Sequence, residues 1–148
     1  MRVVVQPEPF DAGAEASAFA AGRSDIGAVV TFTGVVRSLE DDPIMAMEIE
    51  HYPGMTERAI TGIVQTAMDR WDLADALVIH RFGRLEPGAP IMMVATAAAH
   101  RAAAFEAADF LMDYLKSRAP FWKKEHRADG GATWVAAKDD DEAALDRW

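Results

Sequence analysis

The chain has 148 residues, of which 51% are hydrophobic and 26% are charged, and its formal net charge is −9. This composition predicts a single globular domain over residues 1–148 and excludes a disordered chain. The acidic balance argues against a nucleic-acid partner, because affinity for phosphate backbones depends on many lysines and arginines. Without a run of about 18 apolar residues or a secretory leader, we expect a cytoplasmic protein with no membrane association.

The first predicted elements alternate between strand and helix. A valine-rich strand covers Arg2 to Gln6, and a helix capped by Asp11 covers Ala12 to Ala21. β-branched and aromatic residues predict a buried strand over Gly27 to Val36. Gly34, inside that strand, indicates a bulge or a close backbone approach.

A polar loop at residues 38–43 leads to the next strand and helix. Residues Ile44 to Tyr52 alternate between apolar and polar side chains, which predicts a half-exposed strand. Thr56 is expected to cap a helix that runs to about Trp71. Its apolar positions recur at helical spacing, which predicts packing against the core.

Two further strands, a third helix and a last strand complete the chain. The strands cover Ala76 to Gly83 and Ile91 to Ala97, and His80 is interpreted as a hydrogen-bonded histidine within the first of them. The helix covers Arg101 to Ser117, and the last strand covers Ala132 to Ala137. The buried stripe of the third helix is predicted to be Phe105, Ala108, Met112 and Leu115.

This order of elements predicts an α+β fold. Short turns join adjacent strands too closely for parallel crossovers, so we expect a mainly antiparallel sheet with helices packed on one face. The acidic C-terminal tail ends in Trp148, a residue type that is often docked at a chain end rather than free.

A cationic segment follows the third helix. Residues 116–127 hold five basic residues against one acid, Glu125, so their local charge is +4 and the rest of the chain sums to −13 (−9 − 4). The basic residues are Lys116, Arg118, Lys123, Lys124 and Arg127. This concentration indicates a bound anion, with a solvated basic loop as the alternative. A lysine among other cations has a lowered pKa and can act as an acid, a base or a nucleophile.

His100 and Arg101 open the third helix. Free backbone N–H groups at a helix start favour phosphate or carboxylate, and arginine adds a bidentate fork. The alternative is that His100 only caps the helix and Arg101 is solvated. Arg101 and Lys116 are about 22 Å apart along one helix, so a small substrate cannot touch both within one subunit. We therefore predict a symmetric homodimer in which His100 and Arg101 of one copy face Lys116 and Lys123 of the other.

Cysteine is absent from the chain. Disulfides, thiolate metal sites and cysteine nucleophiles are therefore excluded, and any sulfur chemistry needs sulfur from a substrate or a partner. The four histidines show no HxH or HxxxH spacing, so nothing indicates a metal site.

Four segments together resemble the catalytic, or large, subunit of molybdopterin synthase. They are GAVVTFTGVVR (27–37), EHYPGM (50–55), AHRAAAFEAADFLMDYLKSRAPFWKKE (99–125) and the terminal RW. The resemblance implies an α/β hammerhead fold and a homodimer that binds one small ubiquitin-like subunit per copy, giving a heterotetramer. It also implies transfer of two sulfurs from the partner's C-terminal thiocarboxylate to cyclic pyranopterin monophosphate. The product is the dithiolene of molybdopterin, and the subunit needs no metal or organic cofactor.

The resemblance also implies residue roles. Lys116 and Lys123 match two catalytic lysines. The substrate-binding positions it implies are Val35, Val36, Arg37, His100, Arg101, Lys116, Lys123, Lys124 and Glu125. Some relatives carry lysine at position 35, so Val35 and Val36 contribute only backbone or packing contacts here. Phe121 and Trp122 are candidate walls of a pocket for the partner's Gly-Gly tail.

Two non-catalytic functions remain open beside the enzyme. One is an anion-binding regulatory module, and the other is a dimeric scaffold for a ubiquitin-like protein. A Lys116→Ala variant distinguishes them. It weakens ligand binding in a regulatory module, leaves partner binding intact in a scaffold, and loses conversion in an enzyme.

Overall fold

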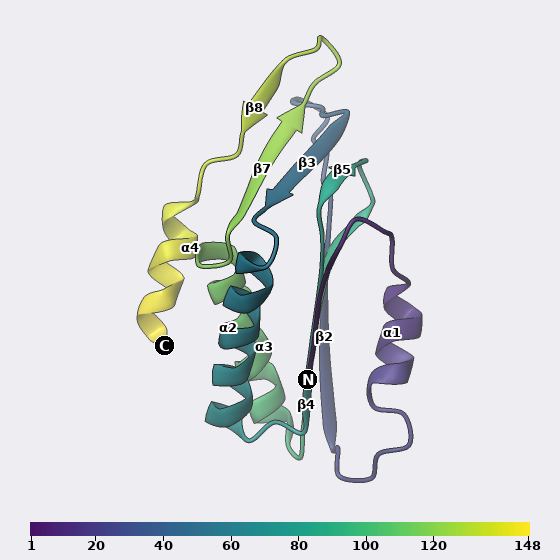
Figure 1. The fold of residues 1–148 in the computed structure, drawn as a ribbon, viewed down its shortest axis with the longest axis vertical. Helices are drawn as coiled ribbons and strands as arrows, with labels where there is room; N and C mark the ends of the chain where they lie inside the picture. The colour runs from purple at the N-terminus through teal and green to yellow at the C-terminus, as the bar shows by residue number, and fades with distance from the viewer.

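The computed structural model describes residues 1–148 and contains two four-stranded sheets (Figure 1). The first has the strand order β1-β4-β6-β2, and the second has the order β5-β3-β7-β8. The strands of the first sheet are β1 (Arg2–Gln6), β2 (Ala28–Val35), β4 (Asp75–Arg81) and β6 (Pro90–Ala98). Those of the second sheet are β3 (Ala46–His51), β5 (Gly83–Leu85), β7 (Phe121–His126) and β8 (Ala132–Trp134).

Only β1 and β4 pair in parallel, and every other strand pair is antiparallel. The helices are α1 (Ala12–Phe19), α2 (Met55–Trp71), α3 (Arg101–Ser117) and α4 (Asp139–Ala143), and a 3₁₀ turn, Ala144–Arg147, follows α4. The predicted α+β class with a mainly antiparallel sheet is confirmed.

The expectation that helices cover one face of the sheet is wrong. In β4, Ala76 and Val78 belong to the main core with α2 and α3, whereas Leu77 and Ile79 pack with Phe19 and its neighbours around α1. Both faces of the central strands are therefore covered, and α1 lies on the side opposite α2 and α3 (Figure 1). A continuous apolar strand such as β4 is typical of a strand buried on both faces.

Local features of the sequence predicted several elements correctly. Asp11 caps α1, because its side chain accepts a hydrogen bond from the N–H of Ala14. The register of β2 against β6 shifts between Gly34 and Val35, which confirms the predicted irregularity. The limits of α3 match the prediction at both ends.

Two details of the helices differ from the prediction. Gly54, not Thr56, is the N-cap of α2. Thr56 is buried within the helix, and its hydroxyl donates a hydrogen bond to the carbonyl of Pro120 (3.1 Å). Phe105 is 61% exposed rather than part of the buried stripe of α3. The buried stripe contains three alanines and three large side chains: Ala104, Ala107, Ala108, Phe110, Leu111 and Leu115.

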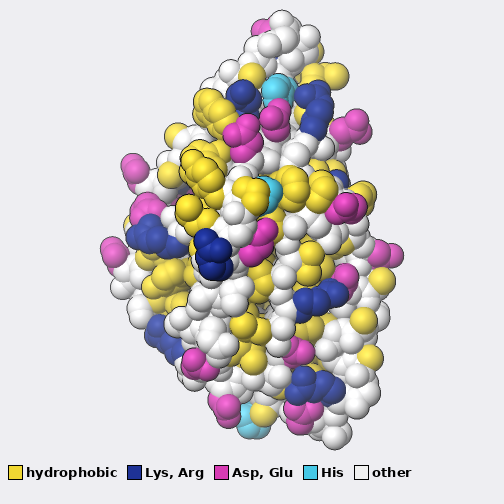
Figure 2. Space-filling view, in the orientation of Figure 1, with side chains coloured by type: hydrophobic (Ala, Val, Ile, Leu, Met, Phe, Trp, Pro, Cys, Tyr) yellow, Lys and Arg dark blue, Asp and Glu magenta, His cyan; other side chains and the backbone are white.

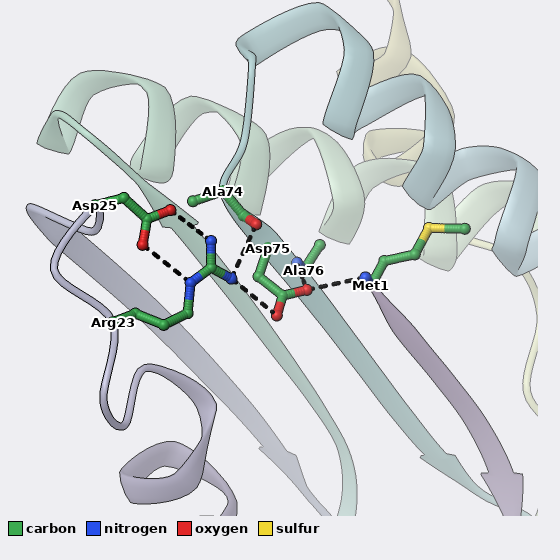
Figure 3. Close-up of polar contacts among 6 residues, drawn as sticks. All are labelled: Met1, Arg23, Asp25, Ala74, Asp75 and Ala76. Carbon is green, nitrogen blue, oxygen red and sulfur yellow. Dashed lines mark hydrogen bonds and ion pairs between the residues drawn. The ribbon is translucent and has the colours of Figure 1, made fainter.

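Polar contacts fix the start of β4 against the loop that leads into β2 (Figure 3). The N-terminal ammonium of Met1 lies 3.0 Å from a carboxylate oxygen of Asp75, and the Arg23 guanidinium lies 3.6 Å from the other. Arg23 also pairs with Asp25 and donates to the carbonyl of Ala74. These contacts hold the loop before β2 close to the end of the sheet where α3 begins.

The C-terminal tryptophan is docked, as expected. The Trp148 ring meets Trp71 and Phe110 edge to face, with centroids 5.8 and 5.6 Å away. Its indole N–H donates to Asp113 at 2.7 Å. The chain end is thereby anchored across α2 and α3, which brings the acidic segment of α4 close to the end of α3.

Removal of the Trp148 ring is expected to destabilise the fold. Full burial of such a ring is worth about 3–5 kcal/mol, and Trp148 is half-buried, so Trp148→Ala should lower the free energy of unfolding by about 2 kcal/mol. Urea denaturation measures the change. Trp134→Ala, at an exposed site, is the control and should cost about 0.5 kcal/mol or less. Equal losses for the two variants would contradict the docking.

Candidate active site

The two predicted catalytic lysines lie close together. Lys116 is in the last turn of α3, and the connection through Pro120 leads directly into β7, which carries Lys123. The pKa of Lys123 lies below the ordinary value of a lysine, first because the ammonium is desolvated by burial and second because the charge of Lys116 is nearby. Lys116 itself is more exposed and lies 3.6 Å from Asp141 of α4. The site therefore pairs a partly buried lysine with an accessible one.

Lys123 has apolar and neutral surroundings. It lies opposite the buried Ile49 in the β3–β7 pair. On the same face of β7, the Phe121 ring stacks on His80 with centroids 3.7 Å apart. His80 is buried, with Nδ1 2.8 Å from the carbonyl of Arg81, and burial lowers its pKa to about 3, so the ring is neutral. The prediction of a hydrogen-bonded strand histidine is confirmed.

No carboxylate oxygen lies within 4.0 Å of the Lys123 ammonium. The Coulombic influence of Asp141 raises its pKa, but this influence is smaller than the two that lower it. A partly buried cation without its own counter-ion favours an external anion. This supports the anion-binding interpretation of the segment over a solvated basic loop.

The other cations of residues 116–127 do not join this site. Arg118 pairs with Glu142 at 2.8 Å, and Arg127 pairs with Asp42 at 3.0 Å and with Glu125 at 3.4 Å. Figure 2 shows basic, acidic and hydrophobic side chains side by side over the end that carries β3, β7 and β8, rather than a uniform basic patch. The local charge of +4 is thus largely neutralised in the folded chain.

Strand alternation separates Lys123 from Lys124. Because adjacent residues of β7 point to opposite faces, Lys124 lies on the far side, where its ammonium sits 4.7 Å from the centroid of the Trp134 ring. The same alternation separates Phe121 from Trp122, which meets Tyr52 edge to face on the far side. Within one chain the two rings therefore do not face each other across a single pocket, and their role as walls for the partner's tail stays a prediction. Phe121 shares the face of Lys123, and Trp122 does not.

The sequence reasoning missed Asp141 and Glu142. The acidic run was visible, but nothing in its spacing indicated that it folds back onto the end of α3. Asp113, which lies three residues before Lys116 in α3, binds Arg147 at 2.6 Å and accepts the indole N–H of Trp148.

The residues at the end of β2 have different exposures. Val35 and Arg37 are exposed. Val36 is buried, its N–H donates to the carbonyl of Ala89 (2.9 Å), and its carbonyl accepts from Gly88 (2.7 Å). The Val36 side chain therefore faces the core, and only its neighbours are free to contact a ligand.

His100 and Arg101 lie at the opposite end of α3 from Lys116. Both are exposed, and His100 is the N-cap residue but makes no side-chain capping bond. Since α3 is continuous over 17 residues, one chain does not bring Arg101 and Lys116 together. Two grooves of the surface, one between α2 and α3 and one beside α1, contain none of the predicted site residues. A site that uses both ends of α3 therefore needs a second copy.

Comparison with known proteins decides the family. The model of the MoaE protein family matches residues 5–118. The molybdopterin synthase catalytic subunit of Cereibacter sphaeroides is 71% identical to the chain over the full length of both. The chain belongs to the MoaE family.

Solved structures agree with this assignment to the MoaE family. The molybdopterin biosynthesis MoaE protein from Burkholderia ambifaria is 49% identical, with a TM-score of 0.83 over 99% of this chain and 96% of that one. A chain of the Helicobacter pylori complex of subunits 1 and 2 of molybdopterin-converting factor is 18% identical, with a TM-score of 0.75 over 93% of this chain and 90% of that one. This second likeness shows the fold alone. None of the helices has the length and apolar character needed to span a membrane.

The pKa of Lys123 should respond to the charge of Asp141. Asp141→Asn removes an influence that raises this pKa, so Lys123 should lose its proton at lower pH than in the wild type. Because the chain has only four lysines, NMR of labelled lysine can follow each ammonium separately. Glu142→Gln, which removes the partner of Arg118 instead, is the matched control and should leave Lys123 unchanged. A rise in the Lys123 pKa in Asp141→Asn would contradict the assignment.

Proposed function

We propose that this chain is the catalytic subunit of a molybdopterin synthase, a sulfurtransferase of molybdenum cofactor biosynthesis. Membership in the MoaE family and full-length identity to a named catalytic subunit support this function. The observation that carries it is the pairing of Lys123, whose pKa is lowered, with the accessible Lys116. A buried lysine with a lowered pKa beside a second cation is typical of a catalytic site rather than of a scaffold.

The reaction transfers two sulfurs to cyclic pyranopterin monophosphate from a partner's C-terminal thiocarboxylate. Substrate and donor are both anionic, and the Lys116–Lys123 pair supplies cationic groups without a dedicated counter-ion at Lys123. A lysine with a lowered pKa exchanges protons near neutral pH more readily than an ordinary lysine. Lys123 is therefore the proposed proton-transfer or nucleophilic group, and Lys116 is the proposed cation that stabilises developing negative charge.

The proposed partner is a small ubiquitin-like subunit, one for each copy of this chain in a heterotetramer. The absence of cysteine fits an enzyme that receives its sulfur from outside. Phe121 stays a candidate wall for the partner's tail, because it lies on the same face of β7 as Lys123.

The remaining binding roles belong to the same proposal. In a homodimer, His100 and Arg101 of one copy bind the phosphate near Lys116 and Lys123 of the other, and Arg37 adds a further cation. The contacts assigned to Val35, Val36, Lys124 and Glu125 stay predictions. So do the absence of a cofactor and the cytoplasmic location.

Reconstitution tests this function. The purified chain is mixed with a thiocarboxylated small subunit and cyclic pyranopterin monophosphate, and the dithiolene product is followed after oxidation to a fluorescent pterin. We expect product only when all three are present. A folded chain that binds the small subunit but forms no product would favour the scaffold function instead.

A further inference from the structure

The segment EHYPGM (50–55) lies against the candidate active site but contains none of the residues implied for it. Thr56, directly after it, donates its hydroxyl hydrogen to the carbonyl of Pro120 (3.1 Å), and the same oxygen accepts the N–H of Tyr52 (3.0 Å). Pro120 belongs to the connection between α3 and β7. The turn from β3 into α2 is therefore bonded to the backbone that joins the two predicted catalytic lysines.

His51, the last residue of β3, lies on the same face of the second sheet as Lys123. It pairs with Phe121 of β7, and Ile49, two residues earlier, pairs with Lys123. Because alternate residues of a strand share a face, these four side chains point to the same side. His51 and Lys123 are thus diagonal neighbours across the strand pair, about 7–8 Å apart, a span that a lysine side chain can cover.

Four rings join the two sheets at this point. The His51 ring packs on Phe82 with centroids 4.1 Å apart, and the Phe121 ring stacks on His80. The pKa of His80 is lowered first by burial and then by the charges of Lys123 and His51, so both of these groups lie close to it. The ring contacts therefore hold His51 in a fixed position near Lys123.

The two histidines differ in their freedom to take a proton. His80 is buried and neutral, and its Nδ1 lies against the carbonyl of Arg81. The His51 side chain is 10% exposed and makes no hydrogen bond within the chain. Since no buried side-chain nitrogen of the chain lacks a partner, the His51 ring nitrogens reach solvent. Of the two, His51 is the one that can change its charge near neutral pH.

A fixed carboxylate lies behind His51. Its Nε2 is 4.0 Å from Oε1 of Glu57, in the first turn of α2. The other oxygen of Glu57 accepts the N–H of Gly54 (2.6 Å), which holds the carboxylate in place. The titratable groups that face His51 are thus Glu57 of α2, His80 of β4 and Lys123 of β7. A proton on His51 is stabilised by the negative charge of Glu57.

We propose that His51 is a positioning residue that acts through Lys123, by accepting the proton that the Lys123 ammonium must lose before it can act as a base or a nucleophile. An N–H bond of Lys123 breaks and an N–H bond of His51 forms, directly or through one water molecule. The positive charge moves from the ammonium to the imidazolium, beside Glu57. The proposal deepens the proposed function and rests on it for the role of Lys123.

His51→Phe separates proton acceptance from packing. Phenylalanine keeps a ring against Phe82 but cannot bind a proton, so the variant should fold and bind the small subunit. In the reconstituted assay at neutral pH, kcat should fall about 10²-fold, the lower end of the range for proton transfer. KM for the pterin should stay within about twofold, because His51 acts through Lys123 rather than on the pterin. Wild-type kcat in His51→Phe would show that His51 only packs, and would overturn the proposal.

His126→Gln is the matched control. His126 lies in the same strand pair but on the other face of β7, where its Nε2 contacts Glu48 at 2.8 Å. Its kcat should stay within about twofold of the wild type. An equal loss of kcat in His126→Gln and His51→Phe would also reject the specific role of His51.

The pH profile of kcat gives a readout that a purely structural role does not move. In the wild type, kcat should fall on the acid side as His51 becomes protonated and can accept no further proton. In His51→Phe the proton must leave Lys123 for water, so the acid limb should follow the Lys123 ammonium itself. Lysine is the stronger base, so this limb should move to higher pH. An acid limb at the same pH in both proteins would contradict the relay.

A titration without substrate or small subunit separates this proposal from the proposed function. The chain has four histidines and four lysines, so NMR of labelled side chains can follow His51 and Lys123 individually. The Lys123 signal should show an inflection at the pH where His51 protonates, and His51→Phe should abolish it. No inflection would overturn the relay even if reconstitution succeeds. An inflection with failed reconstitution would keep His51 as the proton acceptor of Lys123 and remove only the sulfur transfer.

Discussion

Lys116→Ala is expected to reduce product formation by about 10²–10⁴-fold, the range typical of a lost acid–base or charge-stabilising group. The variant should fold normally, because the Lys116 side chain is 49% exposed and its single ion pair, with Asp141, is a partly exposed one. Such pairs contribute about 0.5 kcal/mol or less. Turnover in the reconstituted assay measures the effect, and binding of the small subunit and sedimentation verify that assembly survives.

Lys138→Ala is the matched control for this variant. It removes the same charge from an exposed lysine outside the cationic segment and should leave turnover within about twofold of the wild type. If Lys116→Ala retained full turnover, or if both variants lost it equally, the catalytic role of Lys116 would be rejected.

Mixing two inactive variants should restore activity. Each proposed site uses Lys116 of one copy and Arg101 of the other. A homodimer of Lys116→Ala, or of Arg101→Ala, therefore lacks one of these groups in both of its sites. In a mixed dimer, one site combines Lys116 of one chain with Arg101 of the other and is intact. After random exchange of subunits, half of the dimers are mixed and each has one good site of two, so about one quarter of wild-type activity should return.

The control for this experiment combines Lys116→Ala with Lys123→Ala. Both lysines belong to the same side of the site, so no mixed dimer has an intact site and activity should stay at the level of the separate variants. Recovery in this control, or no recovery with Arg101→Ala, would place His100 and Arg101 outside a shared site. The comparison uses total activity in the reconstituted assay at equal chain concentration.

Much of the fold was predictable because its signals are local. The helix over Arg101–Ser117, the first strand and the cap at Asp11 follow from spacing and from hydrogen bonds within a few residues. The elements that were missed depend on distant partners. The strand β7 has the polar sequence FWKKEH and is held as a strand by pairing with β3 and β8.

In the candidate site, too, the features set by local sequence were predictable and those set by distant segments were not. Sequence spacing correctly predicted that Lys116 and Arg101 occupy opposite ends of one helix, and composition excluded sulfur chemistry based on cysteine. The environment of Lys123 was not predictable in detail, because its desolvation comes from residues far away in the chain. His80 and Ile49 lie on other strands. Asp141 lies near Lys123 only because Trp148 anchors the C-terminus against α2 and α3.

The sequence by itself determined the class of fold and the periodic patterns of the main helices and strands. It also determined the lack of any thiol and the concentration of cations after the third helix. Tertiary structure alone decided which of those cations are free. Strand alternation turned Lys123 and Lys124 to opposite faces, and the folded-back tail neutralised Lys116 and Arg118 in part. Local sequence fixes backbone periodicity, but burial and charge depend on which distant segments meet, and these set the pKa of a lysine.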